Sequence, residues 1–142
     1  MHPWYVAIIK LINFLGLSIC FVILIVMLIS AKEHHKATRT IGLLLSLDVI
    51  LFAYSLIFVL SHSTYYKYND WAILNSDINS VIEKYGVFDV GSIQEGKAGS
   101  VGYYIYTDNV WIMPDHMDHY YWIYFGEDGT VYSVEDSLPP GG

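Results

Sequence analysis

The residue types best suited to chemistry lie close together in residues 113–119, which contain two Asp-His pairs. The pairs are Asp115-His116 and Asp118-His119. Carboxylate and neutral imidazole are ligands that Zn²⁺ and Mn²⁺ take in proteins, and one helical turn would bring the two histidines to one side. No cysteine or third histidine lies nearby in the sequence, so a solvated turn between strands is the alternative. Because histidine changes charge near neutral pH, the functional interpretation is a divalent-metal or pH-responsive site.

Aromatic side chains form the second candidate site. Tyr104 and Tyr106 are two positions apart, as are Trp122 and Tyr124, and this spacing places each pair on one face of a β-strand. We expect these four side chains to form a binding face, and packing in a core or at a membrane interface is the alternative. One short helix cannot cover both faces of a small sheet. The uncovered face is therefore expected to meet lipid, another subunit or a partner.

Patterns typical of catalysis are missing from the sequence. No serine lies in a strand–turn–helix elbow, and no glycine-rich run precedes a helix as in a phosphate-binding loop. We therefore expect a protein that is not an enzyme. No cofactor is expected, apart from the divalent metal ion considered above.

The elements that position these residues fall into two parts, because the composition changes near residue 61. The chain has 142 residues, of which 54% are hydrophobic and only 15% charged, and its mean hydropathy is +0.40. Residues 6–30 and 41–60 are apolar runs, and about 20 helical residues cross the roughly 30 Å hydrocarbon core of a bilayer. A signal peptide would have a shorter apolar core, of about 7–15 residues, after a charged leader. We predict a transmembrane helical hairpin over residues 1–61.

The connector of this hairpin, residues 31–40, predicts the orientation. It contains Lys32, Lys36 and Arg39, and basic residues next to membrane spans stay on the cytoplasmic side. Both termini and the C-terminal domain are therefore expected outside the cytoplasm, in a multi-pass protein of the cell membrane. The connector is either an ordinary topogenic loop or a contact for anionic lipid headgroups.

Asp48 is the one acidic residue inside the predicted spans. A carboxylate there costs roughly 2.5–3.5 kcal/mol on insertion scales, so it usually faces a partner or a cavity. The same depth on the first span falls near Ile23 and Leu24, which offer no cation. Three interpretations stay open: hydration from the cytoplasmic side, an intramembrane contact with another subunit or partner, and an ion or proton path.

Residues 62–138 predict a small α+β domain, followed by a tail at residues 139–142. From Ser61 onward the chain has 12 acidic residues and three lysines, a balance that repels nucleic acid. A short helix is expected over residues 76–86, capped by Asn75 or Ser76 and ended by Gly86. Residues 91–102 are expected to form a mobile loop. The expected antiparallel meander of three to four strands uses residues 102–107, 110–113, 120–125 and 130–134.

The last two strands are expected to form a β-hairpin. A two-residue primed turn at Asp128-Gly129 would pair Phe125 with Tyr132 and Ile123 with Val134. Those four side chains would then share one apolar face of the sheet. Trp122, Tyr124, Val131 and Ser133 would occupy the other face.

The pattern of this domain resembles the SmpA/OmlA-like domain of outer-membrane assembly lipoproteins over residues 76–135. The residues that carry the resemblance are Ser76-Asp77-Ile78, Tyr103-Tyr104-Ile105-Tyr106, Trp122-Ile123-Tyr124-Phe125 and Asp128-Gly129-Thr130-Val131. The resemblance implies an envelope-facing, protein-binding module and no catalytic residue. Members of that family typically have two helices before the sheet and a lipidated cysteine, whereas Cys20 here lies inside a predicted span.

The sequence as a whole predicts a membrane-anchored, extracytoplasmic protein-binding module of a bacterial cell envelope, of the accessory, immunity or exclusion type. The expected partners are membrane lipid, another envelope protein, and further copies of the chain through the transmembrane helices. The alternative is an extracytoplasmic metal- or pH-responsive sensor that uses residues 115–119.

Overall fold

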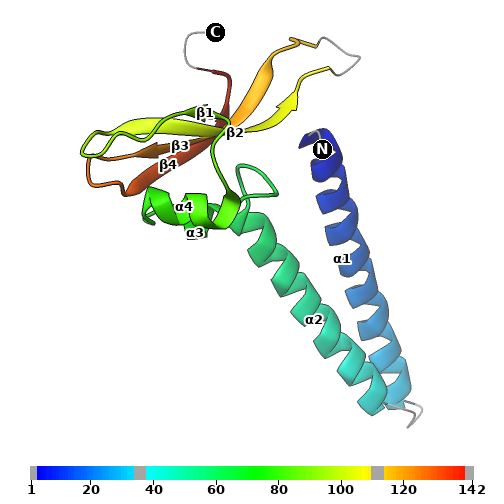
Figure 1. Ribbon diagram of the computed structural model, residues 1–142. Helices are drawn as coiled ribbons and strands as arrows, with labels where there is room; N and C mark the ends of the chain where they lie inside the picture. The colour runs from blue at the N-terminus through cyan, green and yellow to red at the C-terminus, as the bar shows by residue number, and fades with distance from the viewer. Residues whose placement is uncertain (1–2, 34–37, 110–113, 140–142) are drawn as a thin grey trace. The chain divides into compact units, whose positions relative to one another are not determined.

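The computed structural model describes residues 3–33, 38–109 and 114–139 and divides the chain into two compact units. One unit is Trp4–Leu60, and the other is formed mainly by Ser61–Gly142. Figure 1 shows a pair of long helices in the first unit and a small sheet with two short helices in the second. We call them the hairpin and the C-terminal unit.

The hairpin consists of α1, Pro3–Glu33, and α2, Thr38–Ser61. The two predicted helices are confirmed, and each extends a few residues into its polar flanks. Asn13 Nδ2 donates a hydrogen bond to Ser55 Oγ at 2.9 Å, and the rings of Phe14 and Phe52 meet edge to face at 5.4 Å. Most other side chains of both helices are exposed and apolar. Both helices are long and apolar enough to cross a membrane.

The C-terminal unit contains a four-stranded antiparallel sheet in the order β1-β2-β3-β4. The predicted meander is therefore confirmed in its topology. The predicted strand at residues 110–113 lies outside the described residues, and the sheet also contains a two-residue strand before the glycine-rich loop. The strands are β1 Val90–Gly91, β2 Gly99–Thr107, β3 Asp118–Phe125 and β4 Val131–Ser137.

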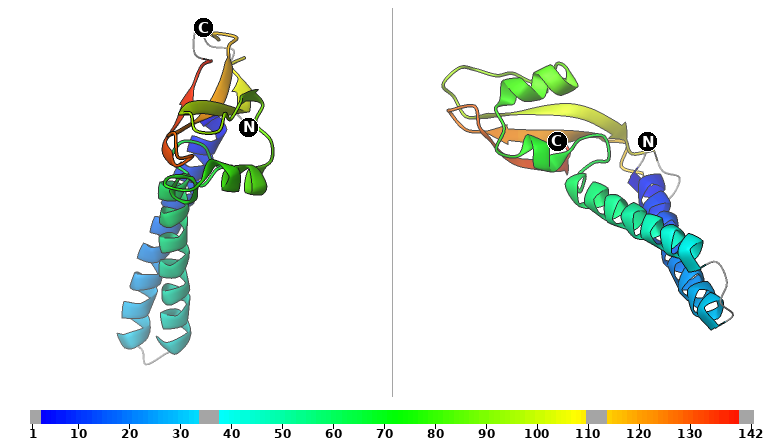
Figure 2. Two further views of the ribbon diagram at one scale, coloured as in Figure 1. Left: turned by 60° about the vertical axis from the view of Figure 1, so that its left-hand side comes forward. Right: turned by 90° about the horizontal axis from the view of Figure 1, so that it is seen from below.

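Two short helices pack against one face of this sheet (Figures 1 and 2). They are α3, Asp70–Ile73, and α4, Ile78–Tyr85, and the second of them is the predicted helix. Ile73, Ile78 and Val81 from these helices are fully or almost fully buried against the sheet. The buried core contains Tyr65, Tyr68, Ile73, Ile78, Val81, Val101, Tyr103, Ile105, Tyr121, Ile123, Phe125 and Val131.

The cap of α4 differs from the expectation. Asp77 is the N-cap, and its Oδ1 accepts a hydrogen bond from the backbone N–H of Asn79 at 2.7 Å. Asn75 cannot fill this role because its φ of +63° places it in the preceding turn, whereas an N-cap needs extended backbone. Gly86 ends the helix with a φ of +94°, as the glycine there predicted.

The hairpin between β3 and β4 corrects the predicted turn. Gly126 O accepts a hydrogen bond from Gly129 N at 3.0 Å, and Gly129 has a φ of +78°. A primed two-residue turn would need a positive φ at Asp128 as well, and Asp128 does not have one. The turn is a four-residue turn ending in a glycine bulge. A second irregularity, between Tyr124 and Phe125, shifts the register between β3 and β4.

This shift exchanges the faces of the sheet on which Val131 and Tyr132 lie. Ile123 pairs with Val134 as predicted, but Phe125 pairs with Val131, and Tyr132 is the extra residue. Val131 is fully buried whereas Tyr132 is 64% exposed. The predicted faces of these two residues were therefore wrong, because a one-residue change of register inverts the alternation along a strand.

The predicted glycine-rich loop is shorter than residues 91–102. Gly91 belongs to β1, and residues 99–102 belong to β2. Gly102 is needed for this pairing, since a Cβ there would lie 2.8 Å from Cγ2 of Val90.

Candidate functional site

The face of the sheet opposite α3 and α4 contains the main candidate site. Tyr104 on β2, Trp122 on β3 and Tyr124 on β3 share this face, as predicted, because they alternate with the core residues Tyr103, Tyr121, Ile123 and Phe125. Ring contacts continue the row, with 5.9 Å between Tyr104 and Tyr120, 5.8 Å between Tyr120 and Trp122, and 6.4 Å between Tyr124 and Tyr132. We call the following five residues the aromatic face: Tyr104, Tyr120, Trp122, Tyr124 and Tyr132.

Tyr106 is not part of this face. β2 has a bulge between Tyr104 and Tyr106, so Tyr106 lies on the same side as the core residue Ile105, the side of α3 and α4. The ring of Tyr106 stacks on the imidazole of His119 with 4.5 Å between centroids. The spacing of two positions in the sequence could not reveal this exchange, because a bulge breaks the alternation.

Exposure varies widely along the aromatic face. Tyr132 is 64% exposed and Tyr104 is 44% exposed, whereas Trp122 is only 4% exposed. Trp122 lies over Gly102, where an added Cβ would be 3.4 Å from its ring. Its Nε1–H is buried and has no hydrogen-bond partner among the described residues. The face thus combines an indole that packs on the sheet with tyrosines that leave ring surface in contact with solvent.

An acidic side chain borders this face. The Tyr124 hydroxyl donates a hydrogen bond to Glu135 on β4. This hydrogen bond, together with burial, raises the pKa of Tyr124 to about 12. The tyrosine therefore stays a neutral donor and the carboxylate stays oriented across the strand pair.

The predicted Asp-His segment is arranged differently from the expected helical turn. Residues 114–117 are not helical, and His116 has a φ of +58° in the turn that joins β2 to β3. The Nδ1 of His116 lies 3.0 Å from Asn109 Oδ1, and Asp118 Oδ1 accepts a hydrogen bond from Thr107 Oγ1 at 2.7 Å. The four predicted ligands therefore do not converge on one point.

His119 instead lies between two carboxylates. Its Nδ1 is 3.1 Å from Asp136 Oδ1, and its Nε2 is 3.8 Å from Asp115 Oδ2. The two carboxylates face opposite nitrogens of one ring, which is a geometry for charge pairing and not for chelation of one ion. Among the described residues, no group of three or more histidine, cysteine, aspartate or glutamate side chains is placed to hold a metal ion. Asp136 was missed in the sequence because it joins this cluster only through the pairing of β3 with β4.

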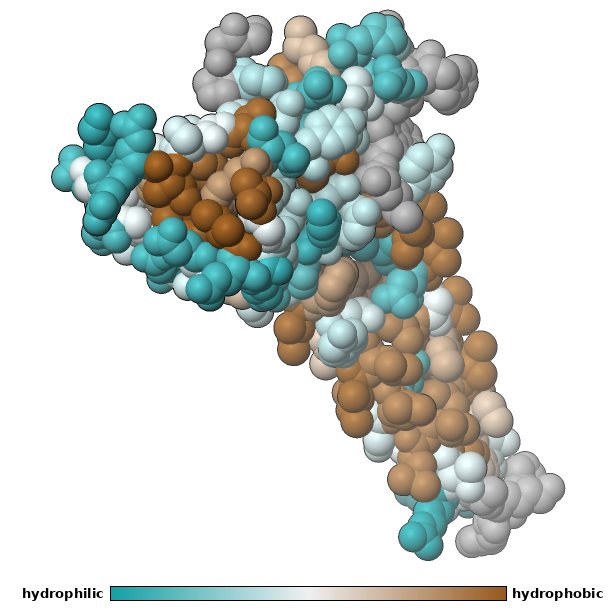
Figure 3. Space-filling view, viewed as in Figure 1, coloured by the Kyte–Doolittle hydropathy of each residue, from teal (hydrophilic) through white to brown (hydrophobic). Residues whose placement is uncertain are grey.

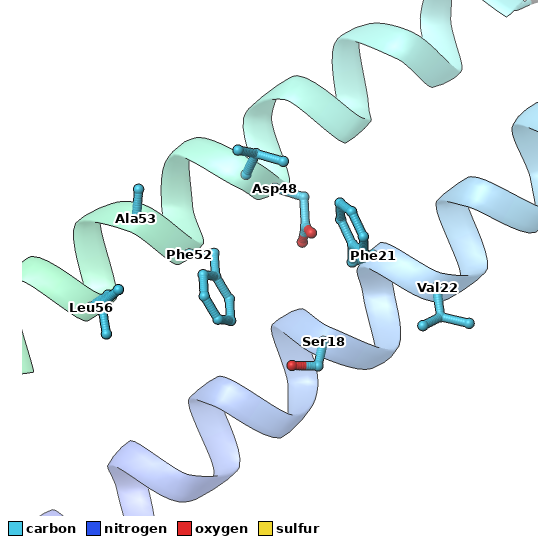
Figure 4. A pocket seen from close by; sticks show the side chains of 8 residues that line it. Ser18, Phe21, Val22, Asp48, Phe52, Ala53 and Leu56 are labelled. Atoms are coloured by element: carbon cyan, nitrogen blue, oxygen red, sulfur yellow. The ribbon is translucent and has the colours of Figure 1, made fainter.

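Asp48 lies in a pocket of about 450 Å³ within the hairpin. Figure 4 shows its carboxylate directed from α2 toward α1, near Phe21 and Ser18. Asp48 is 5% exposed, and it interacts with the thiol of Cys20. The side chains of α1 near Asp48 thus come from earlier positions in the chain than Ile23 and Leu24, the residues expected at this depth.

The remaining wall of this pocket is apolar. It is lined by Ser18, Phe21, Val22, Asp48, Val49, Phe52, Ala53 and Leu56. The basic side chains described in the hairpin, Lys10, Lys32 and Arg39, lie toward the helix ends. The pocket can therefore place one carboxylate beside apolar surface, without a cation from the described residues of the hairpin.

Comparison with known proteins does not assign this chain to a family. No protein-family model matches it, and no curated protein or solved structure shows a significant match. The resemblance to the SmpA/OmlA-like domain stays a prediction.

Proposed function

We propose that this protein is a membrane-anchored binding module of the cell envelope, without catalytic activity, that recognises another envelope protein through its aromatic face. In this proposal the hairpin crosses the membrane and the C-terminal unit lies outside the cytoplasm. The accessory, immunity and exclusion types of envelope protein all fit such a module.

The observation that carries the proposal is the aromatic face, on which Tyr104 and Tyr132 are exposed, Tyr120 and Tyr124 are partly exposed, and Trp122 is buried. Exposed apolar and aromatic surface that is contiguous is uncommon on monomeric proteins and marks interaction sites. Tyrosine and tryptophan are also the residues enriched in binding hot spots. A row of five such side chains, with Tyr132 and Tyr104 exposed, supports a protein contact at this face.

Charge supports a basic partner surface. From Ser61 onward the chain has 12 acidic residues and three lysines, and Glu135 and Asp136 lie exposed on the edge strand β4. Complementary charge raises the rate of encounter and excludes partners of like charge. A partner with lysine or arginine around an apolar centre fits this arrangement.

Membrane anchoring is supported by the hairpin alone. Its helices are apolar on all sides, and a helix of this kind is buried either in a protein core or in a membrane. Lys32 and Arg39 flank its connector, which favours the cytoplasm for that end.

Site-specific photo-crosslinking in intact cells tests the binding face. We expect a photoreactive phenylalanine analogue at Tyr132 to form one dominant adduct with an envelope protein. The same analogue at Glu83, an exposed residue of α4, serves as the control and should not form this adduct. Identical adducts at both positions, or none at Tyr132 and at Tyr104, would refute the aromatic face as the contact.

The flanked imidazole of His119 favours a second candidate function, a pH-responsive contact. Its two ring nitrogens face the carboxylates of Asp136 and Asp115, and its ring stacks on that of Tyr106. A His119→Gln variant should remove a pH dependence of the adduct formed at Tyr132, and an unchanged pH dependence would refute this function. Addition of Zn²⁺ or Mn²⁺ tests the metal version, which fails if tenfold excess metal leaves the melting temperature unchanged.

A further inference from the structure

A pocket of about 500 Å³ opens at the end of the C-terminal unit where α4 begins. Three segments surround it: the first turns of α4, the loop at residues 93–97, and the turn at residues 126–129. None of its lining residues belongs to the aromatic face. Figure 3 shows apolar surface over this end of the unit, surrounded by hydrophilic side chains.

The floor of the pocket is apolar. Ile78 and Phe125 are core residues that line it from below, and Ile82 and Ile93 are partly exposed within it. The loop that contributes Ile93 is held by a turn in which Lys97 N donates to Gln94 O at 3.1 Å, with Gly96 at a φ of +70°. Pockets of roughly 300–1,000 Å³ are typical of binding sites.

The rim of the pocket is acidic. Four carboxylates line it, those of Asp77, Glu95, Glu127 and Asp128. Hydrogen bonds from the backbone N–H and the hydroxyl of Thr130 hold the pKa of Asp128 below its usual value, so this carboxylate stays charged. The single lysine of the lining, Lys97, donates a hydrogen bond from Nζ to Gln94 at 3.0 Å.

We propose that this acidic pocket is a second binding site, which takes an apolar side chain of a partner polypeptide flanked by lysine or arginine. The apolar floor accepts the anchoring side chain, and the four carboxylates pair with the flanking cations. A second copy of this chain is disfavoured because its C-terminal unit has the same excess of acidic residues. Anionic lipid headgroups and nucleic acid are disfavoured by the same charge. The inference goes beyond the proposed function and holds independently of the aromatic face.

Peptide selection on the full chain tests this site. The chain is placed in nanodiscs of neutral lipid, and a phage-displayed library of random dodecapeptides is selected on it. We expect the enriched peptides to share an apolar residue next to lysine or arginine. Their affinity should fall when the salt concentration rises from about 50 to 500 mM, because the rim contacts are exposed.

Paired variants locate the bound peptides. Ile93→Lys places a charge on the pocket floor and should weaken the enriched peptides at least about tenfold. Ser92→Lys adds the same charge at an exposed neighbour that does not line the pocket, and it should bind as the wild type does. Glu95→Lys combined with Glu127→Lys changes only exposed rim residues, and it should also abolish binding. This second variant tests the pocket even if Ile93→Lys does not fold.

Three outcomes would overturn the proposal. They are the absence of enrichment over the Ile93→Lys variant, enriched peptides without basic residues, and equal binding by the wild type and the rim variant. Peptides that are lost on Tyr132→Ser but kept on Ile93→Lys would refute the acidic pocket while supporting the aromatic face. Peptides that are lost on Ile93→Lys but kept on Tyr132→Ser would support the acidic pocket alone.

Discussion

Tyrosine hydroxyl groups connect the sheet to the segments that precede it. The Tyr121 hydroxyl donates to Asp70 Oδ1 at 2.7 Å, and the Tyr103 hydroxyl donates to the carbonyl of Gly86 at 2.7 Å. Asp70 is buried, and its Oδ2 also accepts hydrogen bonds from Ser63 Oγ and Thr64 N. A buried carboxylate is stable only when such donors satisfy it. This carboxylate is therefore a structural group that anchors the start of the C-terminal unit.

Removal of the Tyr121 hydroxyl is expected to destabilise the C-terminal unit. Tyr121→Phe should lower the free energy of unfolding by about 1.5–3 kcal/mol, since it deletes a hydrogen bond to a buried charged group. Denaturant unfolding followed by tryptophan fluorescence measures this change. Tyr132→Phe is the control, and it should change stability by less than about 0.5 kcal/mol because Tyr132 is exposed. Equal effects of the two variants would contradict the role of Asp70 as an anchor.

Alkaline pH should unfold this unit through its tyrosines. Burial, with nearby carboxylates second, raises the pKa of Tyr103 and of Tyr106 to about 12, from a usual value of 10.0. Below pH 10 both the folded and the unfolded chain keep these protons, so the stabilisation is complete. Between about pH 10 and 12 the unfolded chain releases them first, and stability falls. Melting temperatures measured from pH 8 to 12 should decline in this window, and a constant value would contradict the burial of these hydroxyls.

Two β-bulges decide which side chains each strand presents. The bulge between Tyr104 and Tyr106 sends Tyr106 to the side of the helices, and the irregularity between Tyr124 and Phe125 sends Val131 into the core. Each bulge adds one residue, and each therefore inverts the alternation beyond it. The composition of the aromatic face depends on these two positions as much as on the residue types.

Replacement of the glycine in the β3–β4 turn is expected to lower the melting temperature more than replacement of the glycine in the loop at residues 93–97. Gly129 and Gly96 both have positive φ values, of +78° and +70°, so alanine at either position costs about 1–2 kcal/mol. A Cβ at Gly129 would also lie 3.3 Å from Asp77 Oδ2, whereas a Cβ at Gly96 meets nothing within 4 Å. Gly129→Ala should therefore lower the melting temperature more than Gly96→Ala. A larger decrease of the melting temperature for Gly96→Ala than for Gly129→Ala would contradict the four-residue turn.

The two units of the molecule differ in the surface that they expose. The hairpin exposes apolar side chains over both helices, and the C-terminal unit has a buried core of its own and an excess of acidic residues. Apolar surface of this extent needs a membrane or a protein to cover it. Acidic surface is instead compatible with water.

Thiol labelling tests the orientation of the whole molecule. A Cys20→Ser, Glu95→Cys variant has a single cysteine in the exposed loop at residues 93–97. We expect a membrane-impermeant thiol reagent to label it in intact cells, because the basic connector favours the cytoplasmic side for the other end of the hairpin. The Cys20→Ser variant alone is the unlabelled control. Labelling that occurs only after lysis would contradict the orientation and direct the search toward a cytoplasmic partner.

Local patterns in the sequence determined the elements of this protein. The lengths of the two apolar runs predict α1 and α2, since hydrophobic length is a property of consecutive residues. The 3.6-residue spacing of Ile78, Val81 and Tyr85 predicts α4, and the run of aromatic and β-branched residues at 120–125 predicts β3. The pairing of Ile123 with Val134 was also predicted correctly, because the longer turn and the extra residue Tyr132 offset each other.

Only the tertiary structure decided which of these residues meet. The contact of His119 with Asp136, the burial of Asp70 under Tyr121, and the acidic pocket all join segments that are far apart in the chain. β1 and α3 are too short for their own periodicity to predict them, and they are held by the packing of Val90 and Ile73 on the rest of the unit. Bulges and pockets arise from how strands and loops close on one another. Their arrangement depends on many contacts between residues that are far apart in the chain, and the spacing of neighbouring residues does not predict those contacts.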